Sequence, residues 1–139
     1  MGKIKLAITG CMGRMGQQLI KSAIKDKSTK LVALTENRSI NKKISGIRPE
    51  LNTEKALSKA NVIIDFTIPK CTFEVLKIAV KLKKKVVIGT TGFTKKEENI
   101  IKNFLILGLD FSFSISLNFS NNSFCSLFSD IGTSVFTYT

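Results

Sequence analysis

The feature that most constrains the fold is a cluster of three glycines between a strand-like segment and an amphipathic segment. Residues 3–9 read KIKLAIT, which is rich in strand-forming residues. Gly10, Gly13 and Gly16 follow, and residues 14–25 carry apolar side chains at helical spacing. In dinucleotide-binding folds such glycines permit a tight turn, close approach of the backbone to a pyrophosphate, and close helix–sheet packing. The spacing here is G-x-x-G-x-x-G rather than G-x-G-x-x-G, and a turn without a ligand is the alternative interpretation.

Strand-like and helix-like segments alternate over the first hundred residues, which predicts a parallel sheet with helices on both faces. Strands are expected at residues 3–9, 31–35, 62–66 and 86–88, and helices at 14–25, 53–60, 71–82 and from 94 through 104. Residues 39–49 are polar and are expected to form a loop. The predicted fold class is therefore α/β, an incomplete Rossmann-like, doubly wound parallel sheet with an anomalous C-terminal tail.

Several details of these elements can be predicted from local chemistry. The spacing of the first helix places Met15, Leu19, Ala23 and Ile24 on its apolar face. Thr53 is expected to cap the second helix, and the segment 94–97 (TKKE) fits a capping box that opens the last one. The run VIIDF at residues 62–66 is continuously apolar up to its acid, as in strands buried on both faces.

The charge of the chain changes abruptly near residue 103. All 22 Lys and Arg residues lie in residues 1–102, and residues 1–103 hold eight acidic residues, so this part carries +14. Residues 104–139 carry two acidic residues and no basic one, together with seven of the ten Phe and eight Ser. Within them, residues 111–118 alternate at period two, as a strand would. We expect a dinucleotide-binding domain at 1–103 and a Phe/Ser-rich tail at 104–139. The tail is either a genuine apolar segment or, as we favour, a frame-shifted or truncated end.

Composition excludes several classes of function. The net charge of +12 comes from 19 Lys and only three Arg, which is typical of a solvated lysine-rich surface, so no nucleic-acid partner is expected. No apolar run approaches the roughly 20 residues of a membrane span, so no membrane partner is expected. Three cysteines without metal-like spacing indicate reduced thiols in a cytoplasmic protein, and no metal site is predicted. The absence of histidine removes the commonest general acid or base.

Candidate ligand-binding residues follow the ends of the predicted strands. Glu36 comes twenty positions after Gly16, where an acid binds the adenosine ribose in dinucleotide folds; a plain surface carboxylate is the alternative. Arg38, Lys42 and Lys43 lie just beyond and are able to accept a 2′-phosphate, so NADP stays open.

Two further motifs end the third and fourth predicted strands. Residues 65–67 (DFT) and 89–92 (GTTG) lie where open α/β sheets bind ligands, although a Gly/Thr-rich turn is a competing interpretation. Cys11 lies near the predicted helix N-terminus, which is expected to lower its pKa. No partner base is evident for it, so no catalytic role is assigned.

Three segments together resemble one enzyme family. The strings ITGCMGRMGQQLI, VIIDFTIPKCTFEVL and VVIGTTGFT resemble, in order and interval, segments of 4-hydroxy-tetrahydrodipicolinate reductases (dihydrodipicolinate reductases). The resemblance covers residues 3–103, the N-terminal part of that family. Residues 117–120 (LNFS) are only faintly similar to a later family segment, at a longer interval, and the resemblance is not extended to them.

The resemblance implies a reaction and a set of coenzyme contacts. It implies NAD(P)H-dependent hydride transfer to a cyclic dicarboxylate, which forms tetrahydrodipicolinate in the diaminopimelate route to lysine. NADH or NADPH would be held at the pyrophosphate by Gly10, Cys11, Met12, Gly13, Arg14 and Met15, at the adenosine ribose by Glu36, and at the nicotinamide end by Gly89, Thr90 and Thr91. Asn37 stands where relatives carry Arg, so the resemblance leaves the choice of coenzyme open.

The chain also departs from the family pattern. The His-His-x-x-Lys signature and Ser-Gly-Thr segment of the family's substrate-binding, tetramer-forming domain are absent from this sequence. No catalytic residue is therefore carried over, and the family's homotetramer is not expected without that domain. We expect a truncated, catalytically impaired reductase; the alternative is a non-catalytic dinucleotide-binding fragment.

Overall fold

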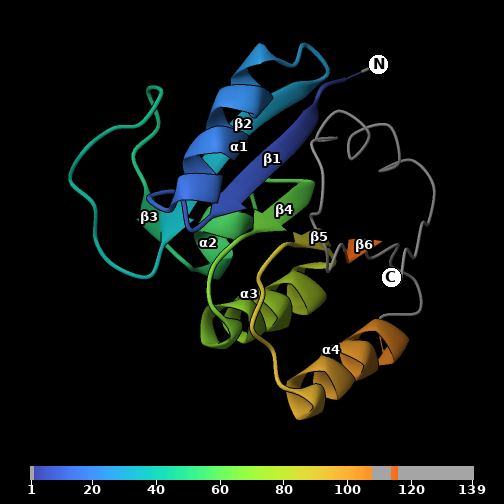
Figure 1. The fold of residues 1–139 in the computed structure, drawn as a ribbon. Coiled ribbons are helices and arrows are strands. Elements are labelled where there is room, and N and C mark those ends of the chain that lie inside the picture. Colours follow the sequence, from blue (N-terminus) through green and yellow to red (C-terminus); the bar gives the residue numbers. More distant parts are fainter. Residues whose placement is uncertain (1, 108–113, 116–139) are drawn as a thin grey trace.

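The computed structural model describes residues 2–107 and 114–115. Six strands of this part form one sheet: β1 (Ile4–Thr9), β2 (Thr29–Glu36), β3 (Glu50–Leu51), β4 (Val62–Asp65), β5 (Lys85–Ile88) and β6 (Ser114–Ile115). Their order is β3-β2-β1-β4-β5-β6, and every neighbouring pair is parallel (Figure 1). This is the strand order of doubly wound dinucleotide-binding folds, so the predicted α/β, Rossmann-like parallel sheet is confirmed. The two outer strands have only two residues each in the described part.

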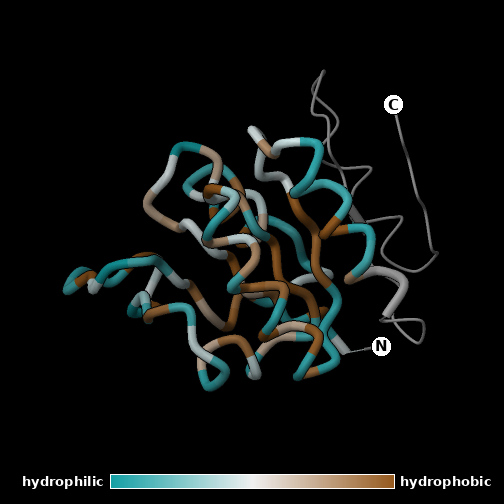
Figure 2. Tube along the Cα trace, turned by 90° about the horizontal axis from the view of Figure 1, so that it is seen from below, coloured by the Kyte–Doolittle hydropathy of each residue, from teal (hydrophilic) through white to brown (hydrophobic). Residues whose placement is uncertain are grey.

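Four helices of the described part cover the two faces of this sheet: α1 (Arg14–Lys25), α2 (Glu54–Leu57), α3 (Pro69–Leu82) and α4 (Lys95–Leu107). Along β1, Leu6 and Ile8 pack in one core cluster with α1, whereas Ala7 packs in the other cluster with α2, α3 and α4. Successive strand residues point to opposite faces, so apolar residues on both faces require helices on both. Figure 2 shows the hydrophobic strands enclosed by more hydrophilic outer segments.

The predicted apolar strands are buried as expected. All four residues of β4 are buried, and Val86, Val87 and Ile88 of β5 are exposed by 2% or less. Removing each such Val or Ile from water stabilises the fold by roughly 1.5–3 kcal/mol. These central strands therefore form a firm base for the loops that follow them.

Helix α1 has the predicted bounds but a different buried face. Its buried residues are Gly16, Leu19, Ile20 and Ala23, whereas Met15 is 40% exposed and Ile24 is 56% exposed. The prediction of Met15 and Ile24 on the packed face is therefore wrong. The helix turns its glycine toward the sheet because only a residue without a side chain permits the close approach observed there, as described below.

The segment between β2 and α2 is more ordered than the predicted loop. Ile44 and Ile47 exchange backbone hydrogen bonds of 2.8 and 2.9 Å around Ser45 and Gly46, whose φ angles are +50° and +80°. Two positive φ angles are the mark of a tight two-residue hairpin turn. Strand β3 follows this hairpin and was not predicted, because two residues give no period-two pattern.

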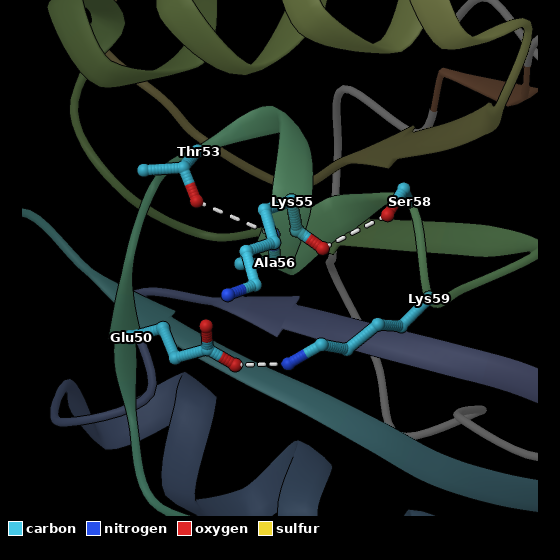
Figure 3. A network of polar contacts seen from close by, with 6 residues as sticks. All are labelled: Glu50, Thr53, Lys55, Ala56, Ser58 and Lys59. Atoms are coloured by element: carbon cyan, nitrogen blue, oxygen red, sulfur yellow. Dashed lines mark hydrogen bonds and ion pairs between the residues drawn. The ribbon is translucent and has the colours of Figure 1, made fainter.

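Helix α2 is shorter than predicted and is fixed at both ends by polar contacts (Figure 3). The Ala56 N–H donates to Thr53 Oγ1 at 3.2 Å, which confirms Thr53 as the cap. At the other end the Ser58 hydroxyl donates to the Lys55 carbonyl at 2.9 Å. Lys59, two residues past the end of the helix, forms an ion pair with Glu50 and so joins this segment to β3.

The last two helices begin with clear start signals. Helix α3 starts at Pro69, two residues before the predicted start, because proline favours the first position of a helix. At α4 the Glu97 N–H donates to Thr94 Oγ1 at 3.2 Å and the Thr94 N–H donates to Glu97 Oε2 at 2.7 Å, which confirms the capping box.

The predicted boundary near residue 103 falls inside α4. Within the alternating segment 111–118, residues 114–115 form β6, which is paired with β5, and the rest of that segment lies outside the described residues. The same holds for residues 116–139 of the predicted tail. The division into a domain and an anomalous tail stays a prediction.

Candidate dinucleotide-binding site

The residues predicted to hold the coenzyme lie at or just after strand ends on one edge of the sheet. Strands β1, β2, β4 and β5 run parallel and end at Thr9, Glu36, Asp65 and Ile88. The glycine turn, Glu36 itself and the 89–91 turn therefore meet at the carboxyl edge, where doubly wound sheets bind their ligands (Figure 1).

The glycine turn is shaped by two positions that exclude a side chain. Gly10 has φ +67°, and a Cβ there would lie 2.5 Å from the Phe66 carbonyl oxygen. A Cβ on Gly16 would overlap the carbonyl oxygen of Gly10 and lie 2.9 Å from Cys11 Cα. Gly10 thus permits the tight turn, and Gly16 lets α1 pack directly against that turn.

Gly13 differs, because its surroundings leave room for a side chain. A Cβ there would lie 3.4 Å from the Gly10 oxygen, and its φ of −72° is open to any residue. Gly13 is the N-cap of α1, without a side-chain cap, and it is exposed, as are Met12, Arg14 and Met15. The first amides of a helix have no partner within it and carry a partial positive charge, so this exposed end is suited to an anion.

Glu36 is held against the glycine turn. Its Oε2 accepts a hydrogen bond from the Met12 N–H at 3.1 Å, and its Oε1 accepts one from the Asn37 N–H at 3.1 Å. Each carboxylate oxygen has two lone pairs, so both retain capacity for ribose hydroxyl donors. Glu36 is thus part of the turn's own hydrogen bonding, and its role at the ribose stays a prediction.

The two threonines of the second turn, residues 89–91, differ in how far they are exposed. Gly89 lies against the ring of Phe66, which a Cβ at position 89 would overlap in its present position. Thr90 is only 2% exposed, and its hydroxyl donates to Asp65 Oδ2 at 3.0 Å while accepting from the Thr67 N–H at 2.8 Å. Thr91 is exposed. Any ligand contact of Thr90 is therefore left to its backbone, whereas Thr91 has its side chain at the surface.

Asp65 is a central residue to which sequence reasoning gave no individual role. Its carboxylate is fully buried and accepts four hydroxyl hydrogen bonds, from Thr9 (2.5 Å) and Thr67 (2.9 Å) at Oδ1, and from Thr72 (2.5 Å) and Thr90 (3.0 Å) at Oδ2. A buried carboxylate is tolerated only when its lone pairs are satisfied in this way. The sequence feature that could have identified Asp65 is an acidic residue within a continuously apolar strand.

Burial raises the pKa of the two thiols in the described part of the chain, Cys11 and Cys71. Cys11 is fully buried, and burial together with the negative charge of Glu36 raises its pKa to about 11. Burial also raises the pKa of Cys71, helped by the charges of Glu74 and Asp65. The expectation that the helix N-terminus lowers the pKa of Cys11 is therefore wrong, because desolvation of the thiolate is the larger effect.

The basic residues beyond Glu36 are all exposed. Arg38, Lys42 and Lys43 belong to the segment between β2 and the hairpin at Ile44–Ile47.

Among residues 2–107 and 114–115 there is no group of three His, Cys, Asp or Glu side chains arranged to hold a metal ion. Within the same part, no helix has the length and apolar character needed to cross a lipid bilayer.

Comparison with known proteins identifies the family. The family model described as dihydrodipicolinate reductase, N-terminus, matches residues 4–119, most of the chain. The chain belongs to the dihydrodipicolinate reductase family. The match continues past residue 103, where the resemblance seen in the sequence ends, to residue 119.

Individual relatives agree with this assignment. The chain is 64% identical over 104 residues to 4-hydroxy-tetrahydrodipicolinate reductase of Pelagibacter ubique, covering 75% of this chain and 40% of that protein. It is 39% identical over 135 residues to the reductase of Buchnera aphidicola subsp. Acyrthosiphon pisum, covering 84% and 49%. The dipicolinate-bound dihydrodipicolinate reductase structure from Paenisporosarcina sp. TG-14 matches with a TM-score of 0.63 at 26% identity, covering 76% of this chain and 44% of that one. The chain thus spans less than half the length of these relatives.

Proposed function

We propose that this chain is the coenzyme-binding part of a 4-hydroxy-tetrahydrodipicolinate reductase and holds NADH or NADPH at the carboxyl edge of its sheet. The observation that carries the proposal is the contact between Glu36 and the glycine turn, with 3.1 Å between Glu36 Oε2 and the Met12 nitrogen. This contact places a ribose-binding carboxylate next to an exposed helix N-terminus, the pair of groups that recognises an adenosine diphosphate moiety.

The residues at this edge fit the parts of a dinucleotide coenzyme. The turn from Met12 to Met15, whose residues are all exposed, would hold the pyrophosphate at the start of α1, and the free space at Gly13 would permit close approach of its oxygens. Glu36 would accept the adenosine ribose hydroxyls, and the turn of Gly89, Thr90 and Thr91 would contact the nicotinamide end. The coenzyme supplies the hydride, and the chain's contribution is to bind and orient it.

The substrate by this proposal is the cyclic dicarboxylate of the reductase reaction, in the diaminopimelate route to lysine. The sequence contains no histidine, and none of the described residues is assigned as proton donor. Loss of a general acid slows a reaction by about 10²–10⁴-fold, and loss of substrate positioning adds to this. We therefore expect coenzyme binding with little or no turnover from the 139-residue chain.

Two measurements test the proposal. Equilibrium titration with NADH, followed by quenching of coenzyme fluorescence, should give saturable 1:1 binding. Steady-state oxidation of NADH with freshly generated 4-hydroxy-tetrahydrodipicolinate should be at least about a hundredfold slower than with a full-length reductase. Absence of binding to folded protein would refute the proposed function. Turnover equal to that of the full-length enzyme would refute the impairment.

The choice between the two coenzymes depends on the groups around Glu36. Its carboxylate favours a free ribose diol and repels a 2′-phosphate, whereas Arg38, Lys42 and Lys43 carry compensating charge nearby in the sequence. Glu36→Gln should therefore raise the affinity for NADPH relative to NADH. The matched control is Glu54→Gln, which removes an acid paired with Lys81 near the C-terminal end of α3 and should leave the ratio unchanged. An unchanged ratio in Glu36→Gln would contradict a role for this carboxylate in coenzyme choice.

A further inference from the structure

A buried carboxylate connects the two glycine turns of the candidate site. Of the four threonines that donate to Asp65, Thr9 immediately precedes Gly10, and Thr90 immediately follows Gly89. Thr9 donates to Oδ1 and Thr90 to Oδ2, so the two oxygens of one side chain each hold one turn. Hydrogen bonds to a charged acceptor are among the stronger ones in proteins.

The residue after Asp65 lies between the same two turns. A Cβ on Gly10 would meet the Phe66 carbonyl oxygen at 2.5 Å, and a Cβ on Gly89 would overlap the Phe66 ring. Both turns therefore pack directly against Phe66, and the Thr67 N–H donates to Thr90 Oγ1 at 2.8 Å. The segment that begins at Asp65 thus lies between the two turns and contacts both.

We propose that Asp65 is a positioning residue that holds the 10–15 turn and the 89–91 turn at the separation required by the two ends of a dinucleotide. The inference rests on the proposed function, because only a ligand that contacts both turns depends on their spacing. A site fixed before binding avoids the ordering cost that a ligand otherwise has to offset. A ligand that contacts the first turn alone gains nothing from the second.

The network provides a matched pair of variants. Thr9 and Thr72 are both fully buried, and each donates to one oxygen of Asp65 at 2.5 Å with a second, longer contact of 3.3 Å to a backbone carbonyl. Valine replaces each hydroxyl with a methyl group at nearly constant volume. Thr9→Val removes the link between the first turn and Asp65 but leaves that turn's own hydrogen bonds, from the Cys11 N–H to the Thr35 carbonyl and from the Met12 N–H to Glu36, in place. Thr72→Val removes an equivalent hydrogen bond from α3, which borders neither glycine.

Two probes separate positioning from general damage to the fold. NADH spans both turns, whereas ADP presents only the adenosine and diphosphate that the first turn would hold. In Thr9→Val we expect the dissociation constant of NADH to rise about tenfold, because the spacing of the two turns then has to be fixed on binding. The dissociation constant of ADP should stay within about twofold, since ADP does not depend on the spacing. Thr72→Val should bind both probes as the parent chain does.

Several outcomes would overturn the inference. The inference fails if Thr9→Val weakens the binding of NADH and ADP equally, or if it binds NADH as the parent chain does. It also fails if Thr9→Val and Thr72→Val weaken NADH binding to the same extent. Asp65→Asn is the direct variant and should show the same loss for NADH alone; if it fails to fold, the threonine pair still decides. If the parent chain binds neither probe, the proposed function itself fails and this inference with it. If the parent chain binds both NADH and ADP, the proposed function stands, and the variants alone decide this inference.

Discussion

Gly13 and Gly16 lie three residues apart, but alanine at the two positions should damage different properties. At Gly16 a Cβ would overlap the Gly10 carbonyl oxygen and lie 2.9 Å from Cys11 Cα, both backbone atoms that cannot rotate away. Forcing a methyl group into such a contact costs about 1–3 kcal/mol or more, against a gain of about 1 kcal/mol from better helix propensity. We expect Gly16→Ala to lose about 2 kcal/mol, which lowers Tm by roughly 10 °C.

Gly13→Ala should behave in the opposite way. The nearest atom to its Cβ is 3.4 Å away, and the residue is exposed, so the cost is below about 1 kcal/mol. The added methyl group lies beside the exposed amides, however, and should weaken NADH binding about tenfold or more by preventing close approach. Thermal unfolding and NADH titration of both variants check this. The reasoning is refuted if Gly13→Ala is the less stable variant, or if it binds NADH as the parent does.

Three further predictions concern other parts of the fold. Thr94→Ala should lower the free energy of unfolding by about 1 kcal/mol in urea titration. The loss in Glu97→Gln should be smaller, because its side chain keeps one acceptor for the Thr94 N–H. Equal losses in the two variants would contradict the capping box. The pKa of Cys11 is raised from 9.0 to about 11, so the stability that its buried thiol contributes is complete below pH 9 and is lost as the pH rises toward 11. The free energy of unfolding of Cys11→Ala should therefore fall less steeply between pH 9 and 11 than that of the parent chain. Equal slopes for the two proteins would argue against a buried thiol. Glu50→Gln breaks an exposed ion pair with Lys59 and should change stability by less than about 1 kcal/mol in the same titration; a larger change would show that the pair matters.

The parts of the fold that depend on local chemistry can be predicted from the sequence. Helix α1 has the predicted bounds because Gly10 and Gly13 lie in the turn before it and a polar cluster follows it. The capping box of α4 also follows from short-range chemistry. Strand β4 is recognised by its continuous apolar run, and the strand–turn–helix arrangement at Gly10 leads to the right edge of the sheet.

The features that escape sequence reasoning depend on contacts between distant segments. The sequence predicts Thr90 as a ligand contact, but its hydroxyl donates to Asp65, which is 25 positions earlier in the sequence. Cys11 has a raised pKa because the folded chain removes it from water and brings Glu36 close. Met15 is exposed because Gly16 takes the packed face of its helix. In each case tertiary packing, which no local pattern contains, decides the outcome.

The central claim is that the first turn of the chain binds the diphosphate of a nicotinamide coenzyme through its backbone amides. Residue-resolved NMR of ¹⁵N-labelled protein titrated with NADH tests this most directly. We predict that the largest amide shifts fall on Met12, Gly13, Arg14 and Met15, and that the shifts saturate together. Shifts confined to the lysine-rich opposite end of the sheet around residues 83–85, or no shift at millimolar NADH, would contradict the claim.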